Sequence, residues 1–105
     1  MLQDSFATAQ ADMRARAIAE ARLDADRLLL ATQTALDADG ALLDVADRDN
    51  ILVLMAQVRA VRTLDDAAAV EAATKALADG TQAFAALRMN HGIRQALAGR
   101  NIETV

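Results

Sequence analysis

The chain has 105 residues, a formal net charge of −4 and a sequence pI near 4.7. This length provides for one small domain, and the acidic balance argues against nucleic acid or an acidic membrane as the partner, since phosphate binding needs a basic face. The absence of cysteine excludes disulfides and thiolate metal sites, as is typical of a cytoplasmic protein. Neither a leader-like start nor a run of about 18 apolar residues occurs, so we expect no signal peptide and no membrane span.

The composition predicts an all-α fold, with a long protruding N-terminal helix, an antiparallel three-helix bundle and a short C-terminal helix. The chain has no proline, and its 54% hydrophobic share is rich in alanine, with Phe6 and Phe84 as the aromatic residues. No stretch alternates β-branched residues as a strand does. We therefore expect the core to be a thin seam of leucine, isoleucine, valine and methionine between closely packed helices.

Residues 2–38 predict one helix, because they contain neither proline nor glycine. At 1.5 Å per residue this helix would span about 50 Å, more than a domain of this size covers. Residues 1–22 are therefore expected to protrude as an arm, and residues 23–98 to form the bundle. The second half of the helix enters the bundle through Ala25, Leu29, Thr32 and Leu36.

The arm carries sparse apolar residues that need a surface to cover them. We expect this face either to dock on another domain or to let the isolated chain associate with itself as a homodimer. The residues of this docking face are Leu2, Phe6, Met13 and Ile18.

Two turns punctuate the chain before its third helix. Asp39-Gly40 fits a helix end with glycine in the left-handed conformation, and Asp44 is the expected N-cap of a second helix over residues 45–62. Asp65 is the expected N-cap of the third helix.

The third helix has the most regular apolar seam. Gly80 lies in this seam, where glycine costs about 1 kcal/mol against alanine and predicts the close approach of a neighbouring backbone or large side chain. We expect a break near residues 89–92, a short helix over residues 91–98 and a flexible C-terminal tail over residues 99–105. The seam consists of Val70, Ala73, Leu77, Gly80, Phe84 and Leu87.

No arrangement of residues indicates catalysis, a metal or a cofactor. His91 is the only histidine, and no carboxylate lies three or four residues from it. A Glu-x-x-His metal motif and a glycine-rich phosphate loop are both absent. We expect a protein that is not an enzyme and that acts through its surfaces.

The order of these features resembles the helical lid of DnaK-class (heat-shock-70-type) chaperones. A long helix begins MLQDS and continues with ADRLLLAT at residues 25–32, and a glycine-containing turn and shorter helices follow it. The ending FAALRMNHGIRQALAGRNIETV, residues 84–105, looks like the C-terminal end of the HscA branch, with its Arg-Met pair, RxAL-Gly segment and acidic-Val terminus. The resemblance covers essentially the whole chain.

If the resemblance holds, the chain is the C-terminal lid of a longer chaperone that matures iron–sulfur proteins. The family's nucleotide-binding domain, with its ATP and magnesium, and the β-sandwich that binds client peptide would precede Met1. The lid itself would contain no cofactor and would close over client peptide from an iron–sulfur scaffold protein. A J-type co-chaperone would act on the longer chaperone that contains this lid.

The resemblance also implies roles for two charged residues. Asp26 matches the position of a latch acid that bonds to sandwich loops, and Arg22 matches a basic residue near the hinge of the lid. Leu30 departs from the polar latch residue of general DnaK lids. The alternative for Arg22 and Asp26 is an ordinary surface ion pair at i, i+4 spacing.

Two other functions stay open. One is a free-standing helical adaptor or regulator that uses the arm on an unrelated partner, and the other is the lid of a general DnaK-type chaperone. An in-frame chaperone ATPase and sandwich upstream of Met1 would separate a lid from an adaptor.

Overall fold

Four α-helices and one short 3-10 helix make up the part of the chain that the structure describes. The computed structural model describes residues 2–103, with the side chains of residues 7–99. No strand occurs in this described part, so the predicted all-α fold is confirmed. The elements are α1 (Leu2–Asp39), the 3-10 helix η1 (Gly40–Leu42), α2 (Val45–Val61), α3 (Ala67–Gly80) and α4 (Gln82–Glu103).

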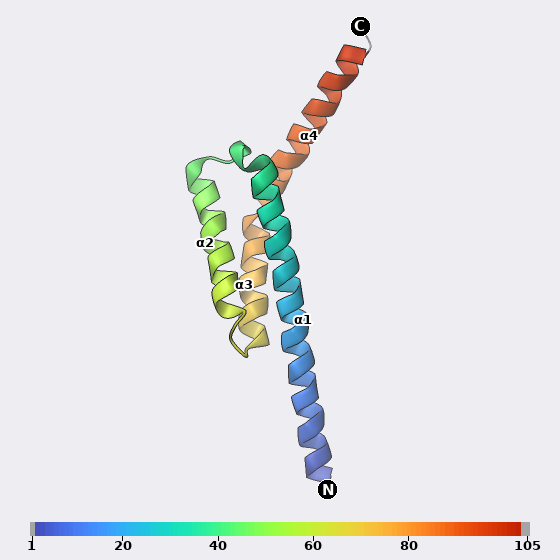
Figure 1. The fold of residues 1–105 in the computed structure, drawn as a ribbon, viewed down its shortest axis with the longest axis vertical. Coiled ribbons are helices and arrows are strands. Elements are labelled where there is room, and N and C mark those ends of the chain that lie inside the picture. The colour runs from blue at the N-terminus through green and yellow to red at the C-terminus, as the bar shows by residue number, and fades with distance from the viewer. Residues whose placement is uncertain (1, 104–105) are drawn as a thin grey trace.

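The helices form a slender molecule with two projecting ends. The second half of α1, α2 and α3 lie together in an up-down-up bundle, so successive helices run antiparallel (Figure 1). The N-terminal part of α1 extends beyond one end of this bundle, and most of α4 extends beyond the other. The overall extents are 79 × 30 × 17 Å.

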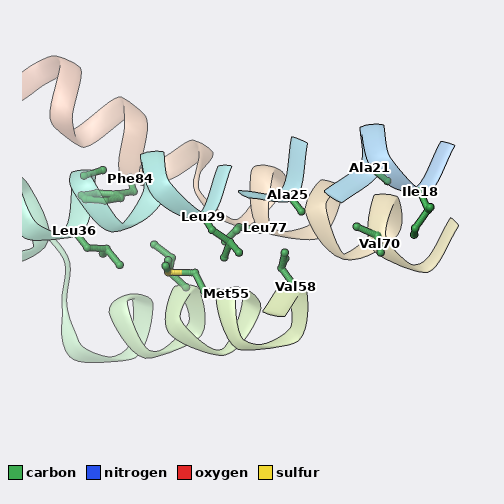
Figure 2. Close-up of a cluster of buried hydrophobic side chains, with 12 residues drawn as sticks. Ile18, Ala21, Ala25, Leu29, Leu36, Met55, Val58, Val70, Leu77 and Phe84 are labelled. Carbon is green, nitrogen blue, oxygen red and sulfur yellow. The ribbon is translucent and has the colours of Figure 1, made fainter. Parts of the chain in front are cut away.

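The core is one buried seam between the three bundle helices. All four residues predicted to place α1 in the bundle, namely Ala25, Leu29, Thr32 and Leu36, are buried. Thr32 is the one polar member, and its hydroxyl donates to the carbonyl of Leu28 at 2.7 Å, so its burial leaves no unpaired donor. Figure 2 shows the seam running the length of the bundle, with side chains from α1, α2 and α3 pointing inward.

Aspartates begin both shorter bundle helices. Asp44 caps α2, as predicted, since its Oδ1 accepts the N–H of Asp47 at 2.8 Å. The predicted cap of α3 is wrong by one residue. Asp66, not Asp65, caps that helix, because Asp66 directly precedes Ala67 and its Oδ1 accepts the N–H of Ala69 at 3.2 Å.

The first turn also differs from the prediction. No described glycine has a positive φ, so Gly40 does not end α1 in the left-handed conformation. Gly40 instead begins η1, and its carbonyl accepts the N–H of Leu43 at 3.1 Å. The chain thus turns from α1 toward α2 by tightening into a 3-10 helix, a common way to pair the carbonyls at a helix end.

The break between the last two helices lies about ten residues earlier than predicted. α3 ends at Gly80, and the Thr81 hydroxyl donates to the carbonyl of Ala78 at 3.0 Å. α4 then runs unbroken through residues 89–92, and residues 99–103, predicted as a tail, continue it. Gly92 lies in open space, and one exposed glycine costs about 1 kcal/mol, too little to end a helix of otherwise good formers.

Gly80 has the packing role that its place in the seam predicts. A Cβ atom at this position would collide with the side chain of Leu54 on α2. The absence of a side chain therefore lets α2 and the end of α3 approach closely.

The base of α4 is fixed to the end of α1. Phe84 is buried in the core, and the guanidinium of Arg88 lies over its ring, 5.9 Å from the centroid. The Nε of Arg88 also contacts Asp39 Oδ2 at 2.8 Å. These contacts hold the first turns of α4 at the top of the bundle, while the remainder extends away from it (Figure 1).

Candidate functional site

The N-terminal arm presents an open surface. Every described side chain from residue 7 to residue 16 is exposed, and Met13 is 69% exposed. The side chains of Leu2 and Phe6 lie outside the described residues. Ile18, by contrast, is 8% exposed and belongs to the core cluster, so it packs inside the bundle and not on an open docking face. The free part of the arm therefore ends near residue 17.

Arg22 lies where the arm enters the bundle. Its Nε donates to the carbonyl of Arg62 at 2.8 Å, and its Nη2 donates to the carbonyl of Leu64 at 3.2 Å. Both carbonyls follow the last turn of α2, where a helix leaves unpaired carbonyls and a negative dipole end. Arg22 thus ties α1 to the connection between α2 and α3.

Asp26, one turn further along α1, makes a second tie to the same place. Its Oδ2 lies 2.7 Å from Nη2 of Arg62, with both side chains partly exposed. The Nε of Arg62 is buried and has no hydrogen-bond partner among the described residues, so the bond from Nη2 to Asp26 is the side-chain contact that this guanidinium makes. Removing Asp26 would leave the Arg62 charge largely unpaired.

These contacts show that Arg22 and Asp26 both bind to the end of α2. The described contacts of the two residues lead to the end of α2 and not to each other, so the simple i, i+4 surface pair is not what forms. We call Arg22, Asp26 and Arg62 the base cluster. Sequence reasoning missed Arg62, because nothing in the local spacing shows that the end of α2 returns to this turn of α1.

Two shallow grooves flank the arm beside the base cluster. One has a volume of about 390 Å³ and lies between Arg14, Arg22 and Asp65. The other, of about 290 Å³, lies between Arg14 and the start of α3. Both are open and mix charges of opposite sign with small apolar residues, which suits contact with a protein surface better than capture of a small molecule.

The described residues contain no group of three or more histidine, aspartate or glutamate residues placed to hold a metal ion. Away from the base cluster, the hydrogen bond that Lys75 Nζ donates to Asp79 raises the pKa of the exposed Lys75 above its ordinary value. Within the same described range, no helix is both long and apolar enough to cross a membrane.

Comparison with known proteins gives matches that cover the whole of this chain. The chain is 65% identical to the chaperone protein HscA homolog of Verminephrobacter eiseniae, 63% to that of Acidovorax sp. (strain JS42) and 58% to that of Paracidovorax citrulli, in each case over all of this chain. No protein-family model matches. The chain is therefore similar over its whole length to a segment of HscA homologues. It spans 17% of the length of each of these HscA homologues.

The HscA match confirms the resemblance read from the order of helices and from the C-terminal segment. At this identity an HscA segment of the same length is expected to share the fold described above. The arm, the base cluster and the bundle thus belong to a chain that is similar to an HscA segment and has no strand among its described residues. The structure gives this segment a helix that projects beyond the bundle at each end (Figure 1).

Proposed function

We propose that this chain is the helical lid of an HscA-type chaperone, closing over client peptide held by a β-sandwich elsewhere in the parent protein. The observation that carries the proposal is the match to HscA homologues, which covers all of this chain and 17% of each homologue. The exposed arm supports it, because a helix that extends beyond its own bundle leaves its side chains for another domain to cover.

The base cluster gives the proposed lid a mechanical property. Because Arg22 and Asp26 both hold α1 to the end of α2, the arm and the bundle would move as one body. A hinge would then lie before the arm and not at Arg22 itself. In this proposal Arg22 and Asp26 keep the lid rigid, which is a different task from a polar latch to the sandwich.

The rest of the proposal concerns the parent chaperone. Its nucleotide-binding domain would bind ATP and magnesium, while the lid would hold no cofactor and have no catalytic activity. The client would be an iron–sulfur scaffold protein delivered with a J-type co-chaperone, in the cytoplasm. The match at 58–65% identity to HscA homologues favours this branch over a general DnaK-type lid or a free-standing adaptor.

Peptide release from the parent chaperone tests the proposal. The full-length protein and a version ending before this segment would be loaded, in the presence of ADP, with a fluorescein-labelled peptide from the scaffold protein. We expect release to be at least tenfold faster without the segment, followed by fluorescence anisotropy after adding unlabelled peptide. Equal release rates from the two proteins would overturn the lid assignment.

A further inference from the structure

We propose that the junction between α3 and α4 is a hinge with two positions, and that the Asp39–Arg88 ion pair holds α4 in the bent position. This inference does not depend on the lid function proposed above. α3 ends at Gly80 and α4 begins at Gln82, so Thr81 is the one residue between the two helices. α4 leaves the end of α3 at an angle (Figure 1).

The backbone at this junction is close to that of a continuous helix. Thr81 has φ −100° and ψ −1°, and a rotation of about 40° in each angle brings it to the values of an α-helix. Its N–H donates to the carbonyl of Leu77 at 3.1 Å, and its carbonyl accepts the N–H of Ala85 at 2.9 Å, both with the four-residue spacing of an α-helix. Straightening therefore requires no unfolding on either side of Thr81.

The bent position leaves helical bonds unmade that the straight position would form. Among the described residues, no helical bond joins the N–H groups of residues 82–84 to the carbonyls of residues 78–80. A continuous helix makes these bonds, and each contributes modestly to stability relative to a bond with water. Contacts between α4 and the bundle are therefore needed to hold the bend.

Two contacts hold the base of α4, and they lie at different distances from the hinge. Phe84, which is 2% exposed, lies about 4.5 Å along the helix from Thr81, so it moves little when α4 turns. Arg88 lies about 10 Å along the helix, and its Nε contacts Asp39 Oδ2 at 2.8 Å. The contact of Arg88 with the Phe84 ring is within α4 and turns with it. The ion pair to Asp39 is thus the contact that has to break.

The base of α4 also has room to turn. A groove of about 110 Å³ lies on its α1 side, where Thr32, Phe84 and Arg88 contribute to the lining. A pocket of about 80 Å³ lies on its α2 side, beside Leu43 and Phe84. Close packing resists the movement of a buried side chain, and these spaces reduce that resistance around Phe84.

The far part of α4 adds little resistance to such a movement. From residue 85 to residue 99, every described residue is exposed except His91, which is half-buried. α4 has 22 residues and is about 33 Å long, so a small rotation at Thr81 moves its far end by several ångströms. The ion pair that opposes this rotation is only partly buried, with Arg88 40% and Asp39 25% exposed. Breaking one weak contact thus redirects a long helix.

Distances between two spin labels test the hinge. The chain has no cysteine, so Gln57→Cys on α2 and Gln95→Cys on α4, both at exposed positions, place one label on the bundle and one on the far part of α4. The labelled chain is diluted with unlabelled chain, so that double electron–electron resonance measures distances within one molecule. We expect two distances, one for the bent and one for the straight position.

Variants of the ion pair then shift the balance between the two distances. Arg88→Ala and Asp39→Ala are each expected to raise the ratio of straight to bent about threefold, the effect of losing a partly exposed ion pair. Lys75→Ala serves as the matched control, because it removes the 2.8 Å pair with Asp79 inside α3. The control should leave the ratio unchanged.

Each outcome supports or overturns a named part of the proposal. A single distance in the wild type and in all three variants would overturn the hinge. Two distances whose ratio is the same in Arg88→Ala, Asp39→Ala and the control would overturn the role of the ion pair. Circular dichroism at 222 nm separates turning from unfolding, because straightening keeps or raises the helical signal. A broad spread of distances with a loss of that signal would show that α4 unfolds, and would overturn the proposal.

Discussion

Arg62 Nη2 lies 2.7 Å from Asp26 Oδ2, and the backbone carbonyl of Arg62 accepts the Nε of Arg22 at 2.8 Å. One residue at the end of α2 thus meets two successive turns of α1 at the point where the arm leaves the bundle. This arrangement fixes α1 to the end of α2 near the start of the arm, and the arm continues the direction of the bundle because α1 is one unbroken helix (Figure 1).

The Asp26–Arg62 pair should couple energetically. Asp26→Ala is expected to lower the free energy of unfolding by about 1 kcal/mol, since it leaves Arg62 without its partner. In a double-mutant cycle with Arg62→Ala, a coupling of about 0.5–1 kcal/mol is expected from urea unfolding. The exposed Lys75–Asp79 pair, at 2.8 Å, provides the control and should couple less. Strictly additive effects at Asp26 and Arg62 would show that the pair contributes nothing.

Gly80 and Leu54 should also depend on each other. Gly80→Ala introduces a Cβ into the space of the Leu54 side chain and forces that leucine to another rotamer. In a Leu54→Ala background the same change is expected to be less costly by about 1 kcal/mol, as measured by chemical unfolding. An identical cost in both backgrounds would show that the two helices do not pack closely here.

Gly92 should behave in the opposite way from Gly80. A Cβ at Gly92 meets no atom within 4 Å, and the position lies inside the continuous helix α4. Gly92→Ala is therefore expected to raise helix content and to stabilise α4 by about 0.5–1 kcal/mol. Circular dichroism at 222 nm checks this, and a loss of helix would favour the break that the sequence predicts at this place.

The seam residues of α3 and α4 should carry much of the stability. Leu77 is fully buried and Phe84 is 2% exposed, so alanine at either position should cost about 2–5 kcal/mol. Leu97→Ala, at an exposed position of α4, serves as the control and should change stability by less than about 0.5 kcal/mol. Melting temperatures that scarcely move for Leu77→Ala would contradict the seam.

The isolated chain should associate with itself through its arm. Met13 is largely exposed and lies on the face that the sequence assigns to docking. We expect concentration-dependent dimerisation in sedimentation, weakened by Met13→Asp with no change in melting temperature. A monomer at every concentration, or a dimer unaffected by this variant, would contradict a role for the arm face.

The positions of the helix breaks show which features follow from local sequence and which from tertiary contacts. The sequence predicts a helix end near residues 89–92 from a cluster of weak formers. In the structure α4 continues through these residues, and the break lies earlier, where α3 ends at Gly80. Helix propensity amounts to about 1 kcal/mol for a glycine, and local tertiary contacts exceed it. At this end of α3 the bundle places Leu54 against Gly80, a contact between residues 26 positions apart that local spacing does not contain.

The sequence by itself determined the all-α class, the long first helix, the face of α1 that enters the core and the cap of α2. These follow from periodicity, from the absence of proline and from short-range hydrogen bonding, all of which lie within a few residues. Only the tertiary structure decided that Ile18 is buried and that Asp26 pairs with Arg62. Each of these depends on which part of α2 or α3 returns to a given turn of α1. Local spacing does not contain that information, because it is set by packing between segments that are distant in the chain.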